Sequence, residues 1–241
     1  GSPHSPHRAA DEYLKVYQDQ PRNKQNFYGE ITGMDAAVGK LRDSIALLGI
    51  RENTVFWYCS DNGALPVGST GGRRGHKGSI YDGGLAVPAI IEWPGRITQP
   101  RISDVRCNTC DIYPTVLDIV GVKPEKQPPL DCVSLLPLID GEMTTRPRGM
   151  GFWDYPVGGI STPSAAWMAK LYEAQQAGHE PEDKSFLRLD AGVISKQYSK
   201  TELPGHSAWI DGDWKLHRIV AKGAKAPRFE LYNLDDDLAE E

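Results

Sequence analysis

The large apolar side chains between residues 27 and 48 recur at alternating steps of four and three residues. This spacing places them on one face of a helix, so we expect a long amphipathic helix that ends at Gly49. A shorter helical pattern precedes it between Glu12 and Tyr17. The positions of the apolar stripe are Phe27, Ile31, Met34, Val38, Leu41, Ile45 and Leu48.

Two segments rich in β-branched and aromatic residues follow, at 54–59 and 85–91. Their composition predicts two buried strands. The first strand stops at a polar turn, Ser-Asp-Asn-Gly at 60–63, and the second stops at Trp-Pro-Gly, 93–95. Helix, short loop and buried strand make up half of a βαβ crossover, whose first strand we expect before residue 1.

The rest of the chain predicts shorter elements. We expect an edge strand at 103–106 and a helix at 111–120 that ends at Gly121. One side of this helix should carry Ile112, Val116, Ile119 and Val120. A linker at 144–147 leads to a second unit. It should contain a strand at 148–155, a helix at 164–177, a hairpin at 209–216 with Asp211 and Gly212 in its turn, and a strand at 229–234. The predicted class is α/β, followed by a small antiparallel sheet.

Composition argues against two classes of partner. The net charge of -5 does not suit nucleic acid, whose phosphates require a basic face. No stretch approaches the about 18 apolar residues of a membrane span, so we expect no membrane partner. The 241 residues can bury a core without metal or disulfide staples. Cys107 and Cys110 supply half of a four-cysteine zinc site, and we interpret them as plain thiols.

Candidate chemistry lies at the end of the first strand. Asp61 and Asn62 stand at its carboxyl end, which is the edge where open α/β sheets bind ligands. Carboxylate and amide oxygens are hard ligands that suit Ca²⁺ or Mg²⁺. Asp-Asn-Gly is also a common turn that ends strands without any metal, and the residues alone leave both interpretations open.

A glycine-rich basic loop comes next, at 71–79. It is short, and its glycines suit one small anion better than a polymer. Gly75 and Gly78 allow the backbone to approach such an anion closely. Lys77 lies between them, although a solvated loop lysine is the common alternative.

The order of these motifs resembles the second half of a sulfatase of the alkaline-phosphatase superfamily. The matching segments are Ser-Asp-Asn-Gly at 60–63, Arg-Gly-His-Lys-Gly at 74–78, Tyr-Asp-Gly-Gly at 81–84, Trp-Pro-Gly at 93–95, Leu-Asp-Cys-Val-Ser-Leu at 130–135 and Glu-Leu-Tyr-Asn-Leu at 230–234. The resemblance implies that residues 1–143 are part of an alkaline-phosphatase-like sheet flanked by helices. It also implies that residues 144–241 form a small C-terminal α+β subdomain, with an insertion near 161–206.

The resemblance also implies roles for single residues. It makes Lys77 and His4 catalytic groups over a sulfate, and Asp61 and Asn62 ligands of Ca²⁺, with Mg²⁺ as the alternative. The candidate substrate-binding residues are Arg74, His76 and His206. Arg74 could equally well only cover the loop, and His76 stands where the family usually has a small residue, so its role is open. A lone loop histidine such as His206 is more often simply exposed.

The implied activity is hydrolysis of sulfate esters through a formylglycine. No cysteine or serine here lies in the C/S-x-P/A-x-R motif that yields it. We therefore expect formylglycine in a missing N-terminal half of the same protein, and no activity from this chain alone. The expected substrate is a sulfated small molecule or carbohydrate, and the expected location is extracytoplasmic: secreted, periplasmic or lysosomal.

Two other functions are compatible with these residues. A phosphodiesterase or phosphonate hydrolase of the same superfamily would use a similar metal and lysine motif. A non-catalytic binding protein would keep the scaffold and lack the nucleophile. The sequence upstream of residue 1 would separate the three.

Overall fold

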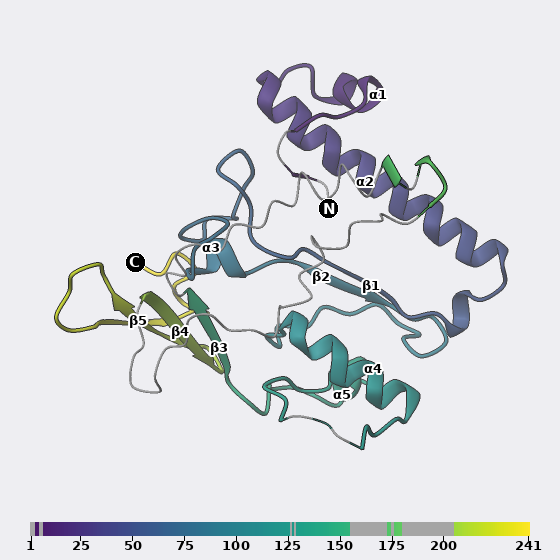
Figure 1. The fold of residues 1–241 in the computed structure, drawn as a ribbon. Coiled ribbons are helices and arrows are strands. Elements are labelled where there is room, and N and C mark those ends of the chain that lie inside the picture. The colour runs from purple at the N-terminus through teal and green to yellow at the C-terminus, as the bar shows by residue number, and fades with distance from the viewer. Residues whose placement is uncertain are drawn as a thin grey trace.

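The computed structural model describes residues 3–4, 7–125, 127, 129–154, 173–174, 176–179 and 205–241. Its longest element is helix α2 (Arg22–Leu47), which starts after Pro21 and ends where Gly49 takes a positive φ of 69°. Helix α1 (Asp11–Leu14) and the 3₁₀ turn η1 (Lys15–Tyr17) pack against its first half (Figure 1). These elements confirm the predicted helices. None of the described helices is both long and apolar enough to cross a bilayer.

Strands β1 (Phe56–Cys59) and β2 (Ala89–Glu92) form an antiparallel pair after the short 3₁₀ turn η2 (Arg51–Asn53). Figure 1 shows α2 along one side of this pair, and helices α4 (Ile112–Val120) and α5 (Leu136–Ile139) on the other. Both predicted strands are present, although β2 starts later than expected. Their predicted burial is wrong, because β1 is only half-buried and Ile90 of β2 is 61% exposed. In the described part of the chain this sheet has two strands, too few to cover either of them fully.

The next helical region is 3₁₀ turn η3 (Thr109–Asp111), helix α4 (Ile112–Val120) and helix α5 (Leu136–Ile139). Gly121 ends α4 with a φ of 67°, as expected. The predicted packing side is wrong, since Val116 is exposed and Thr115 is buried. The Thr115 hydroxyl accepts from the Leu135 backbone N–H at 2.8 Å, which turns this side of α4 toward α5.

The predicted edge strand at 103–106 is absent, since this described segment has no regular structure. The Val105 backbone N–H donates to the Ser103 hydroxyl at 3.3 Å. Such a local bond competes with strand pairing for the same backbone group.

A second sheet holds strands β3 (Met150–Asp154), β4 (Gly205–Asp211), β5 (Trp214–Val220) and β6 (Arg228–Asn233). They are antiparallel neighbours in chain order. The hairpin is confirmed with a shift of one residue, because Asp211 pairs with Trp214 and leaves Gly212 and Asp213 in the turn. Most of the predicted helix at 164–177 and of the insertion near 161–206 lies outside the described residues.

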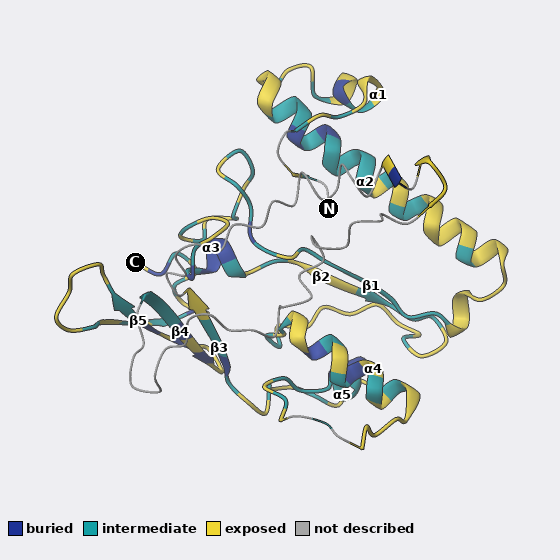
Figure 2. Ribbon diagram, in the orientation of Figure 1, coloured by how far each residue is buried: buried dark blue, intermediate teal, exposed yellow. Residues whose placement is uncertain are grey.

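Burial alternates along parts of strands β4 and β5, and Figure 2 colours the residues of this sheet by burial. One face holds the small core of Met150, Ile210 and Leu234, and the same face turns toward the glycine-rich loop and the short helix α3 (Asp82–Leu85). The opposite face exposes large side chains, among them Trp209 and Phe229. The second sheet therefore meets the loop through its buried face.

A buried ion pair connects the segment before β3 to η3. The Arg146 guanidinium donates to both carboxylate oxygens of Asp111, at 2.6 and 2.8 Å. The two side chains are only 6% and 0% exposed. Asp111 also accepts from the backbone N–H groups of Asn108 and Val133. One carboxylate thus gathers three segments of the chain.

We predict that Arg146→Ala lowers the free energy of unfolding by about 3 to 5 kcal/mol, because it leaves a buried carboxylate unpaired. Urea denaturation of both proteins measures the difference. Arg96→Ala is the matched control, since Arg96 makes the same two-bond contact to Asp140 at an exposed site and should lose much less. Equal losses in the two variants would contradict this account.

Candidate functional site

The turn after β1 presents oxygen atoms in a fixed arrangement. The Ser60 hydroxyl donates to the Asn62 carbonyl at 2.9 Å, and the Asn62 side-chain N–H donates to the Gly63 carbonyl at 3.0 Å. The amide oxygen of Asn62 is left available. Asp61 is exposed, and its carboxylate has no hydrogen bond or ion pair within the described residues. Two adjacent residues at the end of β1 therefore carry hard oxygen donors.

The glycine-rich segment packs backbone to backbone against this turn. Gly63 N–H donates to the Gly84 carbonyl at 2.8 Å, and Lys77 N–H donates to the Ala64 carbonyl at 2.9 Å. Gly63 is buried, and a Cβ there would collide with the Gly83 carbonyl. Only glycine allows this approach. The fold thus places Lys77 and Asp61 on two segments that touch each other.

The other predicted loop residues are on the surface. Lys77 and His76 are exposed, and so is His4 in the N-terminal segment. Their catalytic and substrate-binding roles stay predictions. His7, to which the motifs gave no role, has a structural one, because its ring nitrogen lies 2.9 Å from Glu30 and its ring packs edge-on against Phe27.

A buried cluster of charged side chains lies behind the loop. Lys215 of β5 has 0% exposure, and its ammonium is 2.6 Å from an Asp82 oxygen and 2.9 Å from a Glu240 oxygen. The other Glu240 oxygen accepts from the Asp82 backbone N–H at 2.6 Å. Lys215, Glu240 and the start of α3 are therefore joined by one buried set of contacts. A buried charge needs such partners, because it has lost its water.

His206 belongs to the same cluster. Its Nε2 lies 2.8 Å from Nδ1 of His217, whose own Nε2 lies 2.7 Å from Glu240. Burial lowers the pKa of His206, and the neighbouring His217 and Lys215 lower it further. The ring is therefore neutral at pH 7, so His206 presents no fixed positive charge to a substrate.

Arg74 leaves the loop toward the second sheet. Its guanidinium lies 4.0 Å from the centroid of the Tyr81 ring and donates to the Glu240 carbonyl at 2.8 Å. Burial and the hydrogen bond to Glu230 raise the pKa of Tyr81 to about 12, so this phenol stays a donor at neutral pH. The rings of Tyr81 and His206 pack edge to face, with 5.1 Å between their centroids. Two of the three predicted substrate-binding residues, Arg74 and His206, are thus brought together around one tyrosine.

Sequence reasoning missed Lys215, His217 and Glu240. One signal was available for Lys215, because strand alternation puts it on the same face as Ile210, its partner across the hairpin. Glu240 gave no such signal, since it lies in an acidic run that is typical of a solvated segment.

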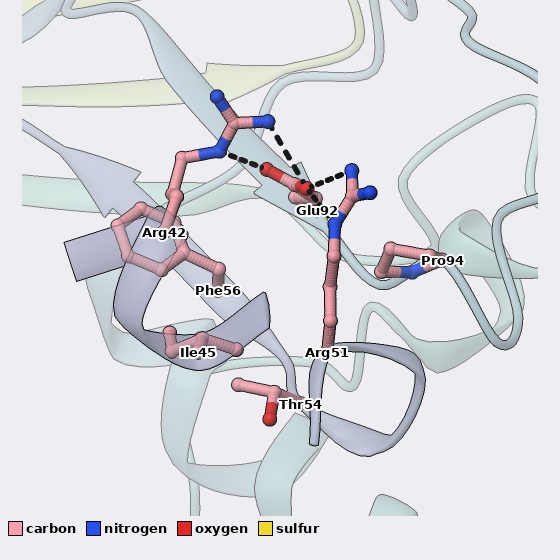
Figure 3. Close-up of a pocket in the computed structure, with 7 residues that line it drawn as sticks. All are labelled: Arg42, Ile45, Arg51, Thr54, Phe56, Glu92 and Pro94. Carbon is pink, nitrogen blue, oxygen red and sulfur yellow. Dashed lines mark hydrogen bonds and ion pairs between the residues drawn. The ribbon is translucent and has the colours of Figure 1, made fainter. Parts of the chain in front are cut away.

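A shallow pocket shown in Figure 3 lies elsewhere, at the amino end of β1. There Glu92 of β2 is held by Arg42 of α2 and by Arg51, at 2.6 and 2.9 Å. Hydrogen bonds from these two arginines lower the pKa of Glu92. Because both carboxylate oxygens of Glu92 accept hydrogen bonds from these arginines, the contact ties α2 to β2.

The comparisons with known proteins bear on this geometry. The sulfatase family model matches residues 1–122, half of the chain. This chain belongs to the sulfatase family. It is 31% identical over 157 residues to the uncharacterized sulfatase YdeN of Escherichia coli K12, covering 63% of this chain. It is 34% identical over 146 residues to the N-acetylgalactosamine-6-sulfatase of Canis lupus familiaris, covering 56% of this chain.

The fold agrees. The crystal structure of Ps i-CgsB in complex with k-i-k-neocarrahexaose matches the whole sulfatase chain with a TM-score of 0.73 at 20% identity. At that identity the likeness shows the fold, and it confirms the predicted fold class. The chain spans 28% of the length of the two curated relatives and 43% of that structure.

The family implies a metal, and two residues at the end of β1 have side chains of the chemistry that would suit one. Asp61 and Asn62 offer unengaged hard oxygens, which fits Ca²⁺ or Mg²⁺. Calcium takes about six to eight oxygens, so these two residues make an incomplete set. No group of three or more His, Cys, Asp or Glu side chains suited to a metal occurs in the described part of the chain.

We predict that Glu240 contributes stability that acid removes. Burial opposes its charged form, but hydrogen bonds from His217, the Asp82 N–H and Lys215 outweigh burial and lower the pKa of Glu240. The contribution is present above the unfolded pKa of about 4.3 and is lost as pH falls through the lower folded value. Urea unfolding should be measured for the parent and for Glu240→Gln between pH 7 and 3. The difference between their free energies of unfolding should narrow below about pH 4.3.

Glu241→Gln is the control for this effect, because Glu241 is exposed. The free energy of unfolding of this variant should match that of the parent at every pH. A gap between the parent and Glu240→Gln that stays constant down to pH 3 would show that the Glu240 charge carries no acid-sensitive stability.

Proposed function

We propose that this chain is the C-terminal half of a sulfatase that hydrolyses sulfate esters of a carbohydrate. One observation supports this best: the backbone hydrogen bond from Lys77 to Ala64, which joins the candidate cationic residue to the turn that carries Asp61 and Asn62. Family membership supports the reaction class.

The proposed chemistry follows from the charge of the substrate. A sulfate monoester carries negative charge that repels nucleophiles, so cationic groups must stabilise its oxygens and an acid must protonate the leaving alkoxide. Lys77 would bind the sulfate oxygens and, together with His4, provide the proton. Asp61 and Asn62 would hold part of a Ca²⁺ site, with Mg²⁺ as the alternative; the bound cation neutralises sulfate charge.

The nucleophile is proposed to lie outside this chain. A formylglycine requires the C/S-x-P/A-x-R motif, which these 241 residues lack. We place it in an N-terminal half of the same protein, together with the remaining metal ligands. An extracytoplasmic location also belongs to the proposal, and it rests on the resemblance alone.

The similar proteins support a sulfated carbohydrate as substrate. One relative is named an N-acetylgalactosamine-6-sulfatase, and the structural neighbour was crystallised with k-i-k-neocarrahexaose. The test is to express the complete protein and assay a panel: N-acetylgalactosamine 6-sulfate, carrageenan oligosaccharides and 4-nitrophenyl sulfate. Turnover of 4-nitrophenyl phosphate or a phosphonate ester, with none of the sulfates, would favour the related phosphoryl or phosphonate hydrolases. Binding without turnover would favour the non-catalytic alternative.

In the complete enzyme, Lys77→Ala should lower kcat by roughly 10² to 10⁴, because it removes a charge that stabilises the transition state. Its metal content should stay near that of the parent. Asp61→Ala should lower metal content as well as kcat. Steady-state kinetics and elemental analysis measure both, with Lys222→Ala as the control for an exposed lysine far along the chain. Unchanged turnover in Lys77→Ala would identify Lys77 as an ordinary surface lysine.

The 241-residue chain alone should not hydrolyse sulfate esters. It lacks a nucleophile, and general acid groups do not replace one. Its calcium affinity should be weak, because Asp61 and Asn62 supply few of the oxygens required. Calorimetric titration with Ca²⁺ and an assay with 4-nitrophenyl sulfate check both points. Micromolar calcium binding together with metal-dependent turnover would contradict the assignment.

A further inference from the structure

A line of three side chains runs from the buried cluster toward the surface. It begins at Glu240 and His217, each with 0% exposure, and ends at the half-buried His206. The contacts are 2.7 Å from Glu240 to Nε2 of His217 and 2.8 Å from Nδ1 of His217 to Nε2 of His206. Both ring nitrogens of His217 are therefore engaged, and only the Nδ1 atom of His206 is left at the outer end.

The charges around this line fix where its protons lie. The Lys215 ammonium is 2.9 Å from the same Glu240 oxygen that His217 contacts, so the carboxylate already has a permanent positive partner. One N–H from His217 satisfies the remaining contact. Because a carboxylate only accepts hydrogen bonds, Nε2 of His217 must carry the proton and its Nδ1 must accept. His206 must then donate from Nε2, which leaves its Nδ1 with a free lone pair.

The surroundings keep His206 in this state. The charged or titratable groups that face it are His217, Lys215, Glu230, Asp154 and the Tyr81 phenol. The balance of burial and these groups keeps the ring neutral. Among the described residues no group hydrogen-bonds to Nδ1, and the His206 residue is half-buried. His206 therefore offers a hydrogen-bond acceptor in a fixed orientation.

We propose that Nδ1 of His206 accepts a hydrogen bond from a hydroxyl group of the sugar that carries the sulfate, and that His217, Glu240 and Lys215 are positioning residues that fix its tautomer. This rests on the proposed function. A lone pair directed outward repels the sulfate oxygens and attracts an O–H donor. The arrangement thus assigns His206 to the uncharged part of the substrate, leaving the sulfate to the glycine-rich loop.

Two substitutions at one position separate this role from a structural one. Asparagine places its amide near the position of Nδ1, whereas glutamine places its amide near the position of Nε2. In the complete enzyme, acting on the sulfated saccharide of the panel that it cleaves best, His206→Gln should lower kcat/KM about tenfold, mainly through KM. His206→Asn should stay within about threefold of the parent. Thermal unfolding of both variants monitors the fold.

Equal losses in the two variants, or no loss in either, would overturn the inference while leaving the proposed function intact. A parent enzyme that cleaves no sulfated saccharide would overturn the proposed function, and the inference with it. The tautomer has its own readout in ¹⁵N-histidine NMR of the complete protein, with the His206 signals assigned by their absence in His206→Gln. The expected state is a proton on Nε2; a proton on Nδ1 alone at pH 7 would also overturn the inference.

Discussion

The position of the candidate site depends on one buried lysine between two carboxylates. Lys215 extends from β5 and contacts Asp82 at the start of α3 and Glu240 near the end of the described chain. The three residues come from parts of the chain that are far apart in sequence, and all are nearly or fully buried. Removing one partner would leave an uncompensated buried charge, so the ion cluster holds these segments in one arrangement more than it adds net stability.

Close backbone packing is a second constraint on the glycine-rich loop. Gly63, Gly83 and Gly84 bring two backbone segments together so closely that a Cβ at any of them would overlap a carbonyl oxygen. Hydrogen bonds through Gly63 and Lys77 complete this contact. The loop is thus fixed by backbone packing on one side and by ion pairs on the other. A fixed loop is what a small-anion site needs, because its charged groups must be in place before the substrate arrives.

Local patterns in the sequence were sufficient to predict the elements whose signals are local. The stripe from Phe27 to Leu48 predicts α2, and the positive φ at Gly49 and Gly121 follows from their place after a helix. The hairpin was found within one residue. The failures share one cause, which is that neighbours distant in sequence decide burial. Ile90 is exposed because few elements cover it, and Thr115 is buried because its hydroxyl meets the Leu135 backbone.

The residues of the candidate site also fall into those that short motifs predict and those that only the fold brings together. Asp61, Asn62 and Lys77 could be named from short motifs, and the structure adds that their segments touch. The His206 line could not be predicted, because it requires β4, β5 and Glu240 to meet in space. A lysine and a glutamate in isolation look like solvated residues, and only the fold shows that they are paired.

Hydrogen–deuterium exchange in Lys215→Met tests most directly whether the buried lysine holds the loop. Methionine keeps much of the side-chain volume and removes the charge, so Asp82 and Glu240 lose their shared partner. Faster exchange is predicted in peptides covering 60–64 and 74–84, relative to the parent and to Lys222→Met. If the change were confined to β5 and its neighbouring strands, while these two loop segments exchanged as in the parent, the loop would not depend on Lys215.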